Sequence, residues 1–371
     1  MNMNQKSCWP TNKQLLLLRA ALFKGDRGLT SWQKWKEEDL DLIDAGSLRL
    51  IPLLYQNLLN HNVKDSILSR YKGVYRHYWA RNRLLIASIT PIIQALNKEG
   101  IEVLIFKGLG LILSLELDAA LRPMDDVDIL IKPEDFSKAL SIIKKMGWKP
   151  KDGIDYKLHE FTNEVSFRND KGKFIDVHLH SLMYCKWGIH ENEFWKRSKV
   201  KNLNGVSVRV IDDTDNLIHI IVHGLGWNSI SPIRWISDSM LIFENTFHNI
   251  EWDYLIEQSK RLQVVLPVLK GLSYLKKEFD APIPEYVISN LKNYKVSFWE
   301  KLVFNLRTRI LISPYINGMF LRILVYYAYR QTYTFPGILR YFQTIWGLDH
   351  LWQVPFAGIK KVFRYYIKTK K

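Results

Sequence analysis

The sequence predicts an α+β fold with a small mixed β-sheet core, helices before the core and a large helical region after it. Apolar residues recur at helical spacing through the first hundred residues and again from Asp213 onward. Between these regions lie short apolar or alternating runs bounded by Gly, Asn and Asp, as in strands. We therefore expect an N-terminal helical region (1–100), an α/β core (101–211) and a C-terminal helical domain (212–371).

The N-terminal region contains three apolar patterns with the spacing of a helix face. They cover residues 15–22, 50–59 and 71–96. Gly100 follows Asn97-Lys98-Glu99 and predicts the end of the third helix, because glycine readily adopts the left-handed backbone that ends helices.

In the central region, short buried strands alternate with helices. Residues 101–106 are almost all apolar and predict a strand, followed by a turn at Lys107-Gly108-Leu109-Gly110 and a helix over 111–117. A second strand is expected over 126–131, and Pro133 opens a helix that runs to about Met146. Further strands are expected over 163–168, 173–179 and 205–211, the first two joined by a hairpin loop at 169–172.

The C-terminal region reads as consecutive helices. Apolar faces at 217–225 and 233–241 predict the first two. Further helices are expected over 252–260, 264–279, 285–292, 298–312 and 321–333.

Composition is that of a globular protein with a strong positive charge. Hydrophobic residues make up 47% and charged residues 24% of the 371 positions, which is ordinary for a folded soluble chain. The formal net charge is +16, from 53 Lys and Arg against 37 Asp and Glu. Such a field attracts nucleotides, nucleic acid or an anionic membrane, although a solubilising basic surface is an equally complete explanation.

Two cysteines, Cys8 and Cys185, exclude a disulfide framework and fit a reducing compartment. No long apolar run begins the chain, and Arg19 interrupts the run at 15–23, so a signal peptide is not expected. The most membrane-like stretch, 323–329, is far shorter than the ~20 apolar residues of a span. These features predict a cytoplasmic protein.

Two carboxylates share one face of the expected strand at 126–131. Side chains alternate along a strand, so Asp126 and Asp128 point to one side, ~7 Å apart, while Val127 and Ile129 point to the other. Divalent cations would relieve the repulsion between the carboxylates, and oxygen ligands of this kind suit Mg²⁺. An isolated Asp-x-Asp is also common on solvated surfaces, and glycosyltransferases use one to hold a metal and a nucleotide sugar.

A later strand offers a third carboxylate. In the strand at 173–179, Asp176 and His178 share one face. If the two strands are neighbours, Asp176 joins the patch, and two carboxylates can bind a metal pair while the third deprotonates or orients an acceptor hydroxyl. The alternative is that Asp176 pairs with a nearby Lys or Arg.

The turn at Lys107-Gly108-Leu109-Gly110 lies between a strand and a helix. Glycine there allows close approach of a phosphate, and the helix N-terminus offers free N–H groups. Lys107 adds a cation for a triphosphate. The turn is neither a Walker A loop nor a dinucleotide fingerprint.

Three segments occur in a recognisable order: Lys107-Gly108, then Leu121-Arg122-Pro123-Met124-Asp125-Asp126-Val127-Asp128, then Asp176-Val177-His178. This order resembles the polymerase-beta-type nucleotidyltransferase superfamily. More closely, it looks like the bacterial "uncharacterised nucleotidyltransferase" family, with its Lys-Gly turn, Arg-Pro-x-x-Asp-x-Asp segment and later acidic-x-His strand. The helical part is similar through His223, Arg234-Trp235-Ile236-Ser237-Asp238 and Trp252-Asp253, so the resemblance spans about residues 75–285.

The resemblance implies Mg²⁺- or Mn²⁺-dependent transfer of a nucleoside monophosphate from a nucleoside triphosphate, such as ATP, to an acceptor, with release of pyrophosphate. By position, Asp126, Asp128 and Asp176 would be catalytic and metal-binding, and Lys107, Gly108, Gly110 and Arg122 would bind the nucleotide. One departure is Leu109, which stands where the superfamily commonly has a serine that touches phosphate.

The acceptor stays open among a small molecule, a peptide, a protein and a glycan. A nucleic-acid enzyme or binder is the first alternative, prompted by the charge, although no nucleic-acid module is recognisable. Two others are a glycosyltransferase, which would need a larger α/β domain, and a nucleotide-binding regulator without turnover.

His178 is expected to border the site, because it shares a face of the strand with Asp176. Together with His180 and Cys185 it also suggests zinc, but no fourth ligand has suitable spacing. Arg234 and Asp238 are four residues apart, so a pair on a helix surface is the default, with a substrate-facing Arg234 as the alternative.

The C-terminus combines an apolar stripe with basic residues. Ile359, Val362, Phe363, Tyr366 and Ile367 have helical spacing, and no acid follows Asp349. Such a helix could lie on an anionic membrane, hold a polyanion or pack onto the protein's own helical domain.

Overall fold

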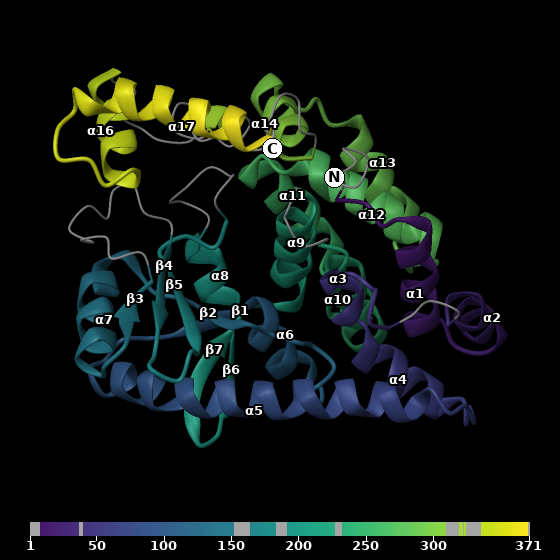
Figure 1. Ribbon diagram of the computed structural model, residues 1–371. Coiled ribbons are helices and arrows are strands. Elements are labelled where there is room, and N and C mark those ends of the chain that lie inside the picture. Colours follow the sequence, from purple (N-terminus) through teal and green to yellow (C-terminus); the bar gives the residue numbers. More distant parts are fainter. Residues whose placement is uncertain are drawn as a thin grey trace.

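The computed structural model describes residues 8–36, 40–151, 164–182, 191–226, 232–308, 319–321, 323 and 335–369. Within them, a seven-stranded mixed sheet stands against helices from both ends of the chain (Figure 1). The predicted α+β class is confirmed.

The N-terminal part is helical. Its elements are α1 (Asn12–Leu22), α2 (Asp26–Trp35), α3 (Ala45–Leu48), α4 (Ile51–Asn60) and α5 (Leu68–Lys98). α1 begins with a capping box in which the Thr11 side chain accepts from Gln14 N and the Gln14 side chain accepts from Thr11 N. The three predicted helices are confirmed as α1, α4 and α5, and Gly100 has a φ of +77° just after α5.

The sheet has the order β3-β4-β5-β2-β1-β7-β6. Its strands are β1 (Leu104–Phe106), β2 (Asp126–Leu130), β3 (Lys149–Pro150), β4 (Glu164–Arg168), β5 (Phe174–His178), β6 (Lys199–Leu203) and β7 (Val206–Val210). β2 pairs with β5 and β1 pairs with β7 in parallel, and the remaining pairs are antiparallel. The five predicted strands are confirmed, although Asn163 lies outside the described residues; β3 and β6 were not predicted.

The segment that joins β1 to the next helix differs from the prediction. Residues 107–110 were expected to be a turn before a helix at 111, but α6 (Lys107–Leu115) begins at Lys107 itself. Lys107 takes the left-handed backbone, with a φ of +53°, so the chain changes direction at the lysine. Gly110 lies within α6 rather than in a turn. A Cβ at this position would lie 2.9 Å from the Ile105 carbonyl oxygen, so only glycine lets α6 pack this closely on β1.

The two faces of the sheet belong to different cores. Val127 and Ile129 pack in a core with α5 and with α7 (Pro133–Lys145). Leu104, Phe106 and Leu130 point to the opposite face and join a core built by the helical regions. Asp126 and Asp128 alternate with Val127 and Ile129, so the carboxylates face the helical side.

After the sheet the chain is helical again. The elements are α8 (Glu191–Arg197), α9 (Asp213–Gly224), α10 (Arg234–Thr246), the 3-10 turn η3 (Phe247–Asn249), α11 (Trp252–Leu262), α12 (Val265–Phe279), α13 (Glu285–Asn293), α14 (Phe298–Thr308), α16 (Phe335–Ile345) and α17 (Gln353–Thr369). The predictions for α9 to α13 are confirmed. The helix expected over 298–312 is described to Thr308, and most of the one expected over 321–333 lies outside the described residues.

N-terminal and C-terminal helices share one core. The Trp9 ring lies 6.0 Å from the Trp235 ring and 4.8 Å from the Tyr274 ring, centroid to centroid. Arg19 on α1 pairs with Glu278 on α12 at 2.9 Å. The domain limits at residues 100 and 211 stay a prediction. In the described part of the chain, no helix combines the length and apolar character needed to cross a bilayer.

Ile129→Ala tests whether β2 is fixed by the core beneath it. Ile129 is 0% exposed, so truncation leaves a cavity and is expected to cost about 2–5 kcal/mol of unfolding free energy. Leu84→Ala on α5 is the control, because Leu84 is 61% exposed and its truncation should change stability by less than about 0.5 kcal/mol. Urea unfolding of both variants checks this, and equal losses would contradict the assignment of Ile129 to the core.

Candidate active site

Three carboxylates meet on the helical side of the sheet. The parallel register of β2 and β5 sets Asp128 directly beside Asp176, and Asp126 lies two residues earlier on the same face of β2. The prediction that these strands are neighbours and that the three acids form one patch is confirmed.

Asp128 is buried between two nitrogen donors. Its Oδ1 accepts from the Lys107 ammonium at 2.5 Å and lies 2.9 Å from His178 Nε2. Burial alone would raise the pKa of Asp128, but the Lys107 charge and the His178 hydrogen bond outweigh it and hold this pKa well below its usual range. Asp128 is therefore ionised at neutral pH.

The other two carboxylates, Asp126 and Asp176, have raised pKa values because of burial and because the three acids lie close together. Burial, followed by repulsion from Asp128 and Asp176, raises the pKa of Asp126 to about 7. Burial and the charge of Asp128 also raise the pKa of Asp176. A cation placed among the three groups would lower both values, which is the electrostatic pattern of a metal site.

The donor set fits a hard divalent cation. One ligand atom each from Asp128, Asp176 and His178 lie within 4.8 Å of one another. Carboxylate oxygens are the protein ligands that Mg²⁺ favours. His178 is better placed as a positioning residue, because its Nε2 faces Asp128 and its Nδ1 lies 3.2 Å from Glu164 Oε2. Cys185, needed for the zinc alternative, lies outside the described residues.

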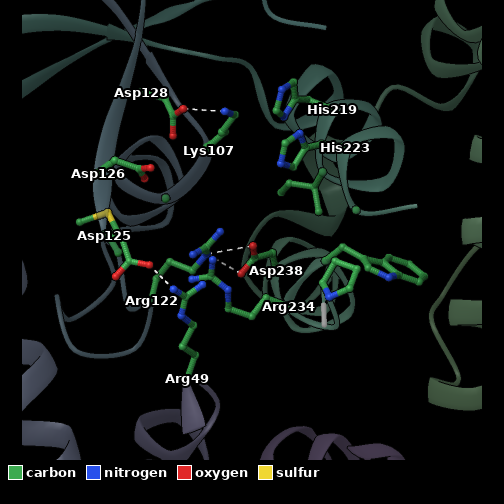
Figure 2. A pocket seen from close by; sticks show the side chains of 16 residues that line it. Arg49, Lys107, Arg122, Asp125, Asp126, Asp128, His219, His223, Arg234 and Asp238 are labelled. Carbon is green, nitrogen blue, oxygen red and sulfur yellow. Dashed lines mark hydrogen bonds and ion pairs between the residues drawn. The ribbon is translucent and has the colours of Figure 1, made fainter. Parts of the chain in front are cut away.

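A cavity of about 320 Å³ opens over Asp126 and Asp128, whereas Asp176, on the neighbouring strand, is not among its lining residues. Figure 2 shows Asp126, Asp128 and Lys107 on one wall, His219 and His223 facing Lys107, and the guanidinium groups of three arginines gathered at the other end. The described residues that line it are Arg49, Lys107, Gly108, Arg122, Met124, Asp125, Asp126, Asp128, His219, Ile220, His223, Gly224, Pro232, Arg234, Trp235 and Asp238.

The start of α6 forms part of this wall. A Cβ on Gly108 would lie 2.8 Å from the Met124 side chain, so the glycine lets the loop before β2 approach the helix. Leu109, which stands where the resemblance has serine, is 1% exposed and packs in the core with α5. Gly110 faces Ile105 on β1 rather than the cavity. Lys107 and Gly108 are thus the residues of α6 that line the cavity.

The basic end of the cavity is built from ion pairs. Arg122 Nε donates to Asp238 at 2.9 Å, and Asp125 pairs with both Arg49 and Arg81. The default expectation of an Arg234–Asp238 pair on a helix surface is wrong, because Asp238 is buried and pairs with Arg122.

Arg234 donates to the main-chain oxygen of Pro123, which also accepts from Arg122. Burial, together with the neighbouring charge of Arg122, lowers the pKa of Arg234 to about 9. A charged guanidinium held here would be stabilised by an anionic ligand.

Several cavity residues were not predicted from the sequence. His219 is buried and donates from Nε2 to the Ser181 carbonyl at 3.0 Å, while burial and the charge of Lys107 lower its pKa to about 3. The His223 ring stacks on the His219 ring at 5.7 Å between centroids. Two histidines one turn apart in the otherwise apolar second half of α9 were a usable signal. Arg49, which follows α3, has no sequence pattern around it that would have indicated its place in the cavity.

The model of a known family, described as "Uncharacterised nucleotidyltransferase", matches residues 43–280. The chain belongs to this family. It is therefore a nucleotidyltransferase, and an NTP is the substrate that the family implies. The match includes α4 to α12 and every described cavity residue.

Two solved structures show a limited likeness to this chain. The antibiotic-resistance factor ANT(2'')-Ia is 12% identical, with a TM-score of 0.34, over 52% of this chain and 98% of that one. An antigenic nucleotidyltransferase-like protein from Paracoccidioides brasiliensis is 15% identical, with a TM-score of 0.34, over 56% of this chain and 92% of that one. At these scores neither informs the acceptor of this chain. No curated protein matches it.

Replacing Asp126 by Asn tests the electrostatic cost of the patch. The pKa of Asp126 lies above its ordinary value in the folded protein, so ionising this group from about pH 4 to about pH 7 destabilises the fold. Without metal, Asp126→Asn should be more stable than the natural protein at about pH 8, with a gain that vanishes toward about pH 4.

Urea unfolding in the presence of a chelator measures this gain at several pH values. Asp170→Asn is the matched control, because the Asp170 side chain is 83% exposed in the β4–β5 loop. A gain that does not change with pH would contradict the assigned burial and repulsion.

Proposed function

We propose that this nucleotidyltransferase moves a nucleoside monophosphate from a Mg²⁺- or Mn²⁺-bound NTP to an acceptor hydroxyl and releases pyrophosphate. The observation that carries the proposal is the β2–β5 register, which sets Asp126, Asp128 and Asp176 on one face of the sheet, where Asp126 and Asp128 line a cavity that also contains arginines. Candidate acceptors are a small molecule, a peptide, a protein or a glycan.

Asp126, Asp128 and Asp176 would hold the metal. A bound divalent ion would neutralise charge on the transferring phosphoryl group and the leaving group. The raised pKa values of Asp126 and Asp176 support this assignment, since each carboxylate lacks a full counter-charge in the protein alone. Lys107 partly compensates Asp128 and keeps it ionised.

The phosphate chain would lie between the start of α6 and the arginines. Free N–H groups in the first turn of α6 and the Lys107 ammonium can bind phosphate oxygens. Arg122 and Arg234, which line the basic end of the cavity, would hold the β- and γ-phosphates. This arrangement extends the nucleotide-binding set of Lys107, Gly108 and Arg122 with Arg234.

The transfer step would be an in-line displacement at the α-phosphorus. The acceptor oxygen forms a bond to the α-phosphorus while the bond from that phosphorus to the bridging oxygen breaks, and pyrophosphate leaves. The acceptor proton would pass to the Asp176 carboxylate, because a bound cation would lower its pKa and keep it ionised, as a general base must be. His178 would orient Asp128 through its 2.9 Å contact.

Loss of either β2 carboxylate should abolish turnover. Asp126→Ala and Asp128→Ala are each expected to lower pyrophosphate release by about a thousandfold, because the metal loses a ligand. The assay follows pyrophosphate and α-labelled product with each NTP, Mg²⁺ or Mn²⁺, and a cell extract as acceptor source. Asp170→Ala in the exposed β4–β5 loop should retain full activity.

The same assay separates the alternatives. If the natural protein binds no metal–NTP, the proposal fails. Binding of metal–NTP without pyrophosphate release by the natural protein would identify a regulator without turnover. Label transferred to nucleic acid would favour a nucleic-acid acceptor instead of the classes named above.

Arg234→Gln tests the placement of the phosphate chain. The substitution removes one charge-assisted hydrogen bond and should weaken binding of metal–NTP about tenfold while leaving nucleoside monophosphate binding unchanged. Titration calorimetry measures both. Arg83→Gln on the exposed side of α5 is the matched control and should change neither. Equal weakening of both nucleotides would place Arg234 away from the terminal phosphates.

A further inference from the structure

An aromatic and aliphatic ridge is exposed at the start of α17. It consists of Trp352, Phe356 and Ile359, which are 65%, 66% and 64% exposed, and we call it the C-terminal ridge. Phe356 and Ile359 lie three residues apart and share one side of α17, and Trp352 immediately precedes the helix. The Trp352 and Phe356 rings contact edge to face, with centroids 6.2 Å apart.

From Val354 to Lys361, the opposite side of α17 is already packed. Val354 is buried against Ile338 and Phe342 of α16 in a small core of their own. A Cβ on Gly358 would lie 3.4 Å from the Trp346 ring, and Lys361 lies 5.1 Å from the centroid of that ring. α17 therefore has a second apolar surface that its packing on α16 does not use.

The ridge leads directly into a basic segment. Lys360 follows Ile359 and is exposed. From His350 to the end, the sequence contains no acid and six basic residues: Lys360, Lys361, Arg364, Lys368, Lys370 and Lys371. Exposed aromatic and aliphatic side chains beside lysines are the composition of helices that lie in the interface of an anionic membrane.

We propose that the C-terminal ridge docks on the surface of an anionic lipid bilayer. Trp352, Phe356 and Ile359 enter the boundary between headgroups and acyl chains, and Lys360 contacts lipid phosphates. The helix lies in the membrane plane, which agrees with the finding that no described helix is fit to span a bilayer.

Two other occupants fit less well. A second copy would bring two basic C-terminal segments together, and their like charges repel. Nucleic acid would neutralise the lysines and could stack bases on Trp352 and Phe356, but it offers no apolar phase for Ile359. An anionic bilayer accommodates all three side chains of the ridge together with the lysines, independently of the nucleotidyltransferase site.

The test is flotation of the full chain with vesicles of phosphatidylcholine, with and without phosphatidylglycerol. The natural protein should float with the phosphatidylglycerol vesicles and much less with phosphatidylcholine alone. The triple substitution Trp352→Ser, Phe356→Ser and Ile359→Ser should weaken binding about tenfold or more, and Lys360→Glu should weaken it by a smaller factor.

The matched control is Trp79→Ser with Leu84→Ser, which removes exposed side chains of similar size from α5 and should leave vesicle binding unchanged. Thermal melts show whether each variant is folded. Equal binding by the triple variant, or no binding by the natural protein, would overturn the proposal. So would gel filtration in which the natural protein is a dimer and the triple variant a monomer, or RNA binding that the triple substitution abolishes.

Discussion

The parallel pairing of β2 with β5 is the constraint on which the site depends. It sets Asp128 directly beside Asp176, although the two residues lie 48 positions apart in the sequence. Alternation along β2 then adds Asp126 to the same face, while Val127 and Ile129 are buried on the other. A shift of one residue in this register would send the carboxylates to the apolar side, so the buried side chains beneath the sheet hold the acids in place.

Clustered carboxylates are costly, and the surrounding residues reduce this cost for one of them. Lys107 adopts a left-handed backbone at the end of β1, and its ammonium reaches Asp128. His178 approaches the same carboxylate oxygen. Asp126 and Asp176 keep raised pKa values. The protein thus stabilises one charge internally and leaves two that a divalent cation would stabilise.

The second wall of the cavity depends on packing between distant parts of the chain. Trp9, Trp235 and Tyr274 bring the N-terminal residues, α10 and α12 into one core. That core fixes α9 and α10 beside the sheet, where His219 faces Lys107 and Arg234 lies with Arg122 at the other end of the cavity. Arg49 reaches the same cavity from the N-terminal helices. The basic end is therefore a product of the whole helical assembly.

The sequence determined most of the elements and the acidic half of the site, because strand alternation and helical spacing are local properties of the chain. The face shared by Asp126 and Asp128 and the Asp176–His178 strand followed from residues two positions apart, and the family followed from the order of three short motifs along the chain. Only the tertiary structure decided that Asp238 pairs with Arg122 rather than Arg234, that α6 begins at Lys107, and that Arg49 and His219 line the cavity. These depend on contacts between segments far apart in the sequence, which no local pattern of residues encodes.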